Sequence, residues 1–281
     1  MTPAEEFKLK QDLSRKFHGL SNDDENRLLN SFPDKKYFEF VHHHWHNRLI
    51  DDLENRWMGW SPWEAWSYPI DDLIRYKKML LDHSTLIEGG KIADLGSHLG
   101  VGVLFCLNIG AERCVGIEPI SDKNKLASFI CGKSGFDNFE FLTGEIKQES
   151  IYQRIKNFDT MILGSLIDMI PDHYRLMENV AKTGIQNIIV EVAEDKRYAK
   201  SEEPHINWYS YDYKSRLEGP FNPAVDKPLH GEPNLAFLKM LMAEFGYRFQ
   251  KQEFFHMQTH EQRPKLRSVS VFQQSSKEDK K

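Results

Sequence analysis

The fold of this chain is most constrained by residues 91–192, where short apolar segments alternate with amphipathic ones. Each apolar segment is rich in β-branched or aliphatic side chains and ends at a glycine or a polar residue, which is typical of a buried strand. The predicted strands are Lys91–Leu95, Cys114–Glu118, Phe139–Thr143, Thr160–Leu163 and Asn187–Val192. The predicted helices between them are Val101–Ile109, Ser121–Lys133, Ser150–Ile155 and Asp172–Lys182. Repeated βα units of this kind predict an α/β fold with a parallel sheet and helices on both faces.

The chain beyond residue 192 changes character twice. Residues 193–234 are rich in proline, glycine, aromatic and charged residues, and we expect an ordered insertion there without the βα pattern. An apolar helix is predicted at Leu235–Phe245. The segments Tyr247–Phe255 and Leu266–Gln273 then alternate in polarity, which predicts a closing antiparallel pair. Five parallel strands and this pair make a mostly parallel, seven-stranded sheet.

Three parts are expected along the chain. Residues 1–90 read as a helical cap rich in aromatic side chains, and residues 91–274 as the α/β domain with its insertion at 193–234. The charged residues 275–281 are expected to be a flexible tail. A length of 281 residues fits one large domain with a cap better than two independent domains.

Composition narrows the range of functions. The net charge of -5 provides no global basic field of the kind that extended phosphate contacts require, which disfavours a nucleic-acid substrate. No run of eighteen apolar residues exists and the first residues are polar, so we expect no membrane span or secretory signal. The three cysteines form no CxxC pair, which fits free thiols in a reducing compartment and predicts a cytoplasmic protein.

The strongest local motif runs from Lys91 to Gly100, where a strand leads into a glycine-bearing turn and then a helix. Such a turn lets a ligand approach the backbone and the free N–H groups of the helix. The motif resembles that of the class I S-adenosylmethionine-dependent methyltransferases, which typically reads Asp-Leu-Gly-x-Gly-x-Gly. Asp94, Gly96 and Gly100 match this pattern, Ser97 occupies a variable position, and His98 stands where the middle glycine is usual. The resemblance makes all five of these residues candidates for contact with the cofactor.

The resemblance implies a Rossmann-like fold with S-adenosyl-L-methionine as the cofactor. It places Asp94 at the amino-acid end of the cofactor and Glu118, followed by Pro119, at the ribose hydroxyls. Glu145 and Ile146 match the third strand end, where the family meets the adenine. Residues 158–168, with Gly164, match the fourth strand and the loop beneath the methyl group. The alternative of a dinucleotide oxidoreductase is disfavoured, because Gly96-Ser97-His98 breaks the G-x-G-x-x-G order that pyrophosphate binding needs.

Catalytic and substrate residues are harder to assign from the sequence. Asp168, His173 and His98 are candidates for a general base, because each is expected on a loop near the methyl group. Methyl transfer from a sulfonium is an in-line displacement that depends mainly on positioning, so a base is optional.

Aromatic side chains are the candidates for contact with the substrate. The tentative set comprises Trp57 and Trp60 in the cap and Tyr209 and Tyr211 in the insertion, although each of them could instead pack a hydrophobic core. His42 and His46 share a helical face, but without a third ligand they do not predict a metal site.

The sequence therefore predicts a methyltransferase that acts on a small-molecule acceptor. Two alternatives stay open. One is a tRNA-modifying transferase that uses S-adenosylmethionine or a derivative, and the other is a non-catalytic module that binds the cofactor or a partner. The sequence does not identify the acceptor.

Overall fold

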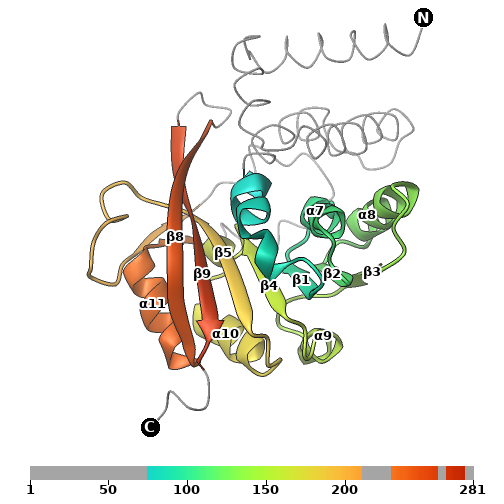
Figure 1. The fold of residues 1–281 in the computed structure, drawn as a ribbon. Helices are drawn as coiled ribbons and strands as arrows, with labels where there is room; N and C mark the ends of the chain where they lie inside the picture. The colour runs from blue at the N-terminus through green and yellow to red at the C-terminus, as the bar shows by residue number, and fades with distance from the viewer. Residues whose placement is uncertain (1–74, 211–228, 259–263, 276–281) are drawn as a thin grey trace, which may run out of the picture. The chain divides into compact units, whose positions relative to one another are not determined.

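A computed structural model describes residues 75–210, 229–258 and 264–275. These residues form a seven-stranded sheet in the order β3-β2-β1-β4-β5-β9-β8 (Figure 1). Strands β1 to β5 are parallel, and β9 is antiparallel to both of its neighbours, β5 and β8. The strands are β1 Lys91–Leu95, β2 Arg113–Glu118, β3 Phe139–Thr143, β4 Thr160–Gly164, β5 Asn187–Ala193, β8 Tyr247–Gln258 and β9 Pro264–Gln274. The predicted mostly parallel, seven-stranded Rossmann-like sheet is confirmed.

Helices cover both faces of the sheet (Figure 1). On one face lie a short helix at residues 75–79, the 3-10 helix η2 Leu81–Leu86, α7 Val101–Ile109 and α8 Ser121–Lys133. On the other lie α9 Glu149–Arg154, α10 His173–Ala181 and α11 Leu235–Glu244. The 3-10 helix η3 Ile167–Met169 follows β4. The predicted bounds of the five helices α7 to α11 differ from the observed ones by one residue at most. Gly100, Gly110 and Gly246 lie at helix ends and mark them in the sequence.

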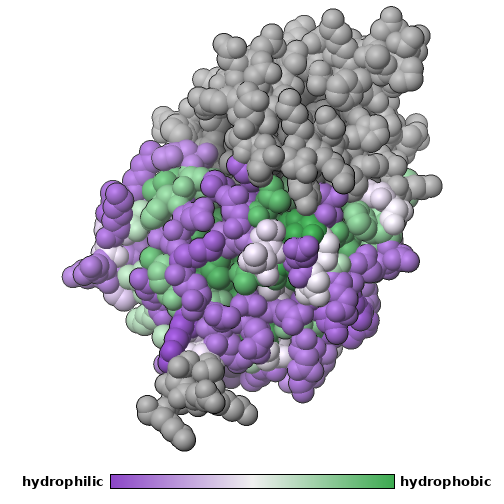
Figure 2. All heavy atoms as spheres, viewed as in Figure 1, coloured by the Kyte–Doolittle hydropathy of each residue, from purple (hydrophilic) through white to green (hydrophobic). Residues whose placement is uncertain are grey.

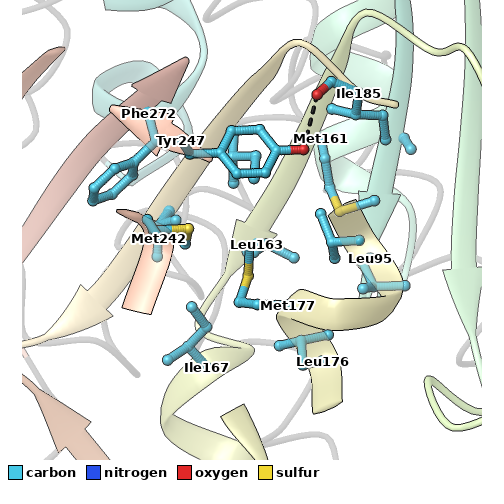
Figure 3. Close-up of a cluster of buried hydrophobic side chains, with 14 of the residues drawn as sticks. Leu95, Met161, Leu163, Ile167, Leu176, Met177, Ile185, Met242, Tyr247 and Phe272 are labelled. Carbon is cyan, nitrogen blue, oxygen red and sulfur yellow. Dashed lines mark hydrogen bonds between the residues drawn. The ribbon is translucent and has the colours of Figure 1, made fainter. Parts of the chain in front are cut away.

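An apolar core lies between the sheet and helices α9, α10 and α11 (Figure 3). Side chains alternate along each strand, so Leu95 and Met161 point into this core while Asp94, between Ala93 and Leu95, points to the opposite face. The Tyr247 hydroxyl is buried with the core and donates a hydrogen bond of 2.8 Å to the Ile185 carbonyl. The labelled members of the cluster are Leu95, Met161, Leu163, Ile167, Leu176, Met177, Ile185, Met242, Tyr247 and Phe272. Burial of each such large side chain contributes about 1.5–3 kcal/mol.

Residues 75–90 belong to the α/β unit, although we predicted the end of the cap at residue 90. The chain divides at residue 74, and Met79 and Leu80 are buried within the second unit. Residues 1–74, which include the other part of the predicted cap, lie outside the described residues. None of the helices in the described ranges is both long enough and apolar enough to cross a membrane. On the face shown in Figure 2, hydrophobic residues gather near the middle of the described part and hydrophilic residues dominate its edges.

The predicted insertion contains a small antiparallel sheet that the sequence pattern did not indicate. Its strands are β6 Ile206–Ser210 and β7 Leu229–Pro233, which pair from Ile206 with Pro233 to Ser210 with Leu229. The two strands are distant in sequence, because residues 211–228 lie between them. Those residues lie outside the described residues. Short strands with a distant partner carry little periodic signal, which explains why only an irregular segment was predicted.

Asn234 fastens the insertion to α11. Its side-chain oxygen accepts hydrogen bonds of 3.0 Å from the backbone N–H groups of Phe237 and His205. Its amide nitrogen donates to the carbonyl oxygens of Glu203 at 2.8 Å and of Tyr198 at 3.3 Å. A single buried side chain therefore caps the helix and holds the preceding loop.

We expect Asn234→Ala to lower the free energy of unfolding by about 1–3 kcal/mol, because it removes a helix cap and leaves buried backbone groups without partners. Urea denaturation measures the loss. Hydrogen exchange should also become faster between residues 198 and 206. Asn187→Ala is the control, because the Asn187 amide makes only one long bond of 3.3 Å to the Asp159 carbonyl. Equal losses in the two variants would contradict the anchoring role.

Candidate functional site

The turn between β1 and α7 is shaped for close packing against the backbone. Gly96 and Gly100 have φ angles of +81° and +78°, a conformation that glycine adopts without strain. A Cβ on Gly100 would lie 2.7 Å from both Ala127 Cβ and Phe141 Cζ, so no other residue fits there. His98 also has a positive φ, of +50°. The histidine that replaces the usual glycine therefore retains a left-handed backbone.

Two polar atoms at this turn are buried without a hydrogen-bond partner among the described residues. They are Oδ2 of Asp94 and Oγ of Ser97. A buried polar group without a partner costs about 1–3 kcal/mol, and such groups are rare in native proteins. The backbone N–H groups of Gly96 and Ser97 both donate to the Ile117 carbonyl, which fixes the turn beside the end of β2. The side chains of Asp94 and Ser97 are thus positioned to bind a ligand.

The pKa of the Asp94 carboxyl group is raised by its surroundings. Burial raises its pKa to about 7, and the nearby Glu118 carboxylate adds to this, while the Arg75 guanidinium opposes it. Asp94 is therefore about half protonated near neutral pH. A cation placed against it would favour the ionised form.

Glu118 ends β2 at the same edge of the sheet, as the sequence predicted. Its side chain is buried, and Oε1 accepts a hydrogen bond of 3.3 Å from the Ile120 N–H and lies 3.7 Å from Lys123 Nζ. The Asn124 amide donates to the Glu118 carbonyl at 2.9 Å and to Thr143 Oγ1 at 3.0 Å, which ties the ends of β2 and β3 together. A carboxylate held in this way can accept hydrogen bonds from the two hydroxyl groups of a diol.

The other predicted cofactor-binding residues lie at or just after the ends of β2, β3 and β4. Glu145 is exposed, and its N–H donates to Gln148 Oε1 at 3.2 Å, while the Ile146 carbonyl accepts a hydrogen bond of 2.8 Å from the Tyr152 hydroxyl. Pro119 is exposed. A Cβ on Gly164 would lie 2.8 Å from Arg75 Nη2, so this glycine makes room for a side chain of helix 75–79.

A second polar cluster lies on the Asp94 face of the sheet and was not predicted. Glu191 in β5 is fully buried, and its Oε2 accepts hydrogen bonds from Arg75 Nε at 2.8 Å and from Ser165 Oγ at 3.0 Å. Its Oε1 accepts a short hydrogen bond from Arg267 Nε, and Arg267 Nη2 donates to Ser165 Oγ. One signal for this cluster was available in the sequence, because a lone carboxylate inside the apolar strand Asn187–Ala193 requires a cationic partner.

Asp168 and His173, both predicted as catalytic, have different surroundings in the structure. Asp168 is buried on η3, and its Oδ2 lies 3.9 Å from Arg267 Nη2, so it belongs to the edge of the second polar cluster. His173 is also buried, but its Nε2 lies 2.8 Å from the Ile167 carbonyl, which makes this nitrogen the donor. Its ring stacks on Trp208 of β6 with the centroids 5.6 Å apart, and burial lowers its pKa. This environment gives His173 the role of anchoring the insertion to α10.

The remaining candidates are less completely placed. Burial, together with the charges of Lys123 and Arg75, lowers the pKa of His98 well below its ordinary value, so its imidazole is neutral. Tyr209 lies in β6, but its side chain is outside what the structure describes, and Trp57, Trp60 and Tyr211 lie outside the described residues. In the described ranges no three His, Cys, Asp or Glu side chains are grouped to hold a metal ion.

Comparison with known proteins places this geometry in a structural class. No family model matches the sequence, and no curated protein matches it. Magnesium protoporphyrin IX methyltransferase from Synechocystis PCC 6803, solved with bound SAH, is 12% identical with a TM-score of 0.54, covering 85% of this chain and 97% of its own. A SAM-dependent methyltransferase from Methanosarcina mazei is 15% identical with a TM-score of 0.53, covering 69% and 96%. The chain therefore has the Rossmann-like fold of the class I methyltransferases.

Proposed function

We propose that the chain binds S-adenosylmethionine across the carboxyl ends of β1 and β2 and transfers its methyl group to a small molecule. The observation that carries this proposal is the pair of buried atoms Asp94 Oδ2 and Ser97 Oγ, which lack partners beside a glycine turn. Ligands of open α/β sheets bind at this edge. Two solved structures with the same fold, the Synechocystis enzyme and the N-terminal domain of EvdMO1, contain SAH, which supports the choice of ligand.

The side chains present fit the chemical groups of this cofactor. The Asp94 carboxylate would accept hydrogen bonds from the ammonium group, and the Glu118 carboxylate would accept them from the ribose hydroxyls. Glu145 and Ile146, in the loop after β3, would bound the adenine. The bound cofactor supplies a methyl group activated by the sulfonium. Asp94 and Ser97 are both buried, so a group bound to them would have little contact with water.

Toward the methyl acceptor, the main contribution of this chain is to hold the acceptor in position. Gly164 ends β4, Ser165 and Asp168 follow it, and the insertion at 193–234 is proposed to cover the acceptor. Orientation of two reactants and exclusion of water can supply most of the rate of an in-line displacement. Of the candidate bases, Asp168 is a better choice than His173, because the imidazole of His173 is buried against Ile167 and Trp208.

The test supplies S-adenosylmethionine with a labelled methyl group to the full chain, together with separated small-molecule and RNA fractions of cells. We expect label in the small-molecule fraction, and none with Asp94→Asn. Label in the RNA fraction would replace the proposed acceptor with a tRNA-like one. Binding of cofactor without transfer to either fraction would favour a non-catalytic module.

Cofactor binding should depend on pH through Asp94. Its pKa of about 7 in the free chain means that below pH 7 the carboxyl must lose a proton before it can bind an ammonium. The affinity for S-adenosylhomocysteine should therefore weaken as pH falls, by up to about tenfold for each pH unit below 7. Calorimetry between pH 5.5 and 7.5 measures this slope. The slope should be absent in Asp94→Asn, and an equal slope in both proteins would contradict the assignment.

A further inference from the structure

The second polar cluster brings two guanidinium groups to one buried carboxylate, Glu191. Arg75 alone binds Glu191 Oε2 at 2.8 Å, and Ser165 adds a hydrogen bond to the same oxygen. Arg267 then brings a second guanidinium to Oε1, with a side chain only 10% exposed. Removal of a further cation from water costs several kcal/mol unless another anion offsets it. Asp168, whose Oδ2 lies 3.9 Å from Arg267 Nη2, offsets this charge without making a hydrogen bond to the guanidinium.

Arg267 uses only part of its hydrogen-bonding capacity. A guanidinium has five N–H donors in one plane. Nε donates to Glu191 and Nη2 to Ser165, which occupies one side of that plane. Nη1 makes no hydrogen bond to a described residue, and Asp168 Oδ2 lies 3.9 Å from Nη2, beyond hydrogen-bonding distance. The edge formed by Nη1 and the second N–H of Nη2 thus remains available.

This edge lies beside the region where the proposed reaction takes place. Ser165 and Asp168, the two residues next to the Arg267 Nη2 atom, both belong to the loop after β4. Ser165 itself has a φ of +50°, a sparsely populated conformation for a serine, and its bonds to Glu191 and Arg267 hold it there. A strained serine in this loop, held by an arginine of β9, is a feature of a preorganised binding site.

We propose that Arg267 is a specificity-determining residue that binds an oxyanion, a carboxylate or a phosphoryl group, on the methyl acceptor. Two parallel N–H groups of a guanidinium match two oxygens of such a group, which lysine cannot reproduce. Glu191 and Ser165 position the guanidinium, and the oxyanion would accept hydrogen bonds from the N–H groups of Arg267 that these two residues leave unused. This inference rests on the proposed function, because the acceptor must lie beside the bound cofactor.

The experiment uses the full chain saturated with S-adenosylhomocysteine, whose binding is checked first by calorimetry. Sodium acetate or sodium phosphate then replaces sodium chloride at constant ionic strength, and acetamide serves as the neutral analogue of acetate. We expect the melting temperature to rise with acetate or phosphate in a saturable way and to be unchanged by acetamide. The more effective anion distinguishes a carboxylate from a phosphoryl acceptor.

Two variants of Arg267 connect the effect to this residue. Arg267→Lys keeps the charge beside Glu191 but loses the planar fork, and should weaken the apparent affinity for the anion about tenfold. Arg267→Met should abolish it. Arg175→Met, which removes an exposed arginine paired with Glu178 on α10, controls for the loss of one charge and should leave the effect unchanged.

An absent anion effect in the wild-type chain with S-adenosylhomocysteine bound would overturn the proposal and leave the proposed function intact. An undiminished effect in Arg267→Lys would also overturn it, even if Arg267→Met does not fold. Failure to bind S-adenosylhomocysteine would overturn the proposed function and this inference together, and is seen before any anion is added.

Discussion

Glu118→Ala is expected to weaken the binding of S-adenosylmethionine and S-adenosylhomocysteine by about two orders of magnitude. The carboxylate ends β2, is buried, and is held by the Ile120 N–H and by Lys123. Removal of two hydrogen bonds to a charged group costs roughly 3 kcal/mol, which corresponds to about a hundredfold in Kd. Calorimetric titration of the purified variant measures the change.

The matched control for this prediction is Glu112→Ala, at the other end of the same strand. Glu112 precedes β2, is 61% exposed, and makes only a surface ion pair of 3.6 Å with Lys91. Its removal should change the Kd by less than about twofold, because a surface pair contributes little. A Glu118→Ala protein that is folded and binds as tightly as Glu112→Ala would show that the ribose lies elsewhere.

Glu191→Gln should have the largest effect on stability, a loss of about 3–5 kcal/mol in the free energy of unfolding. The variant leaves Arg75 and Arg267 buried without their shared anion. Burial alone would raise the pKa of Glu191, but Arg267 and Arg75 outweigh it and hold the pKa at about 2. Because the folded pKa lies below the unfolded one, the stabilisation by Glu191 is complete above about pH 4.5 and is lost as pH falls toward 2.

The control for Glu191 is Glu140→Gln, which removes a glutamate that also pairs with two arginines, Arg113 and Arg154. Its two partners are half exposed, so the loss should stay below about 1 kcal/mol. Urea unfolding of both variants at pH 7 gives the comparison. A loss below 1 kcal/mol for Glu191→Gln would contradict a stabilising role for the buried cluster.

The sheet was predictable because its signals are local. Strands β1 and β3 and helices α7 and α8 have the predicted bounds, since apolar runs, glycines and helix ends lie within a few residues of each other. Asp94, Ser97 and Glu118 could be assigned to one site for the same reason: parallel strands place their carboxyl ends at one edge. Even the departure from the family motif at His98 left the turn in its left-handed conformation.

The polar cluster behind the site could not be predicted. Glu191 is separated from Arg267 by 76 positions and from Arg75 by 116, and no periodicity connects them. For His173 the sequence analysis expected a loop position, whereas the residue is the first of α10. The orientation of its ring toward Ile167 and Trp208 depends on packing of an insertion strand that was itself missed. Position along the chain was thus easier to predict than the direction of a side chain.

The most direct test of the cofactor site is hydrogen exchange of the wild-type chain with and without S-adenosylhomocysteine. We expect slower exchange in two segments, 94–100 and 116–120, because the ligand would cover the turn after β1 and the end of β2. Exchange at the opposite end of the sheet, around Gly184, should not change. Protection confined to other segments, or no protection at saturating ligand, would contradict the central claim that this edge of the sheet binds the cofactor.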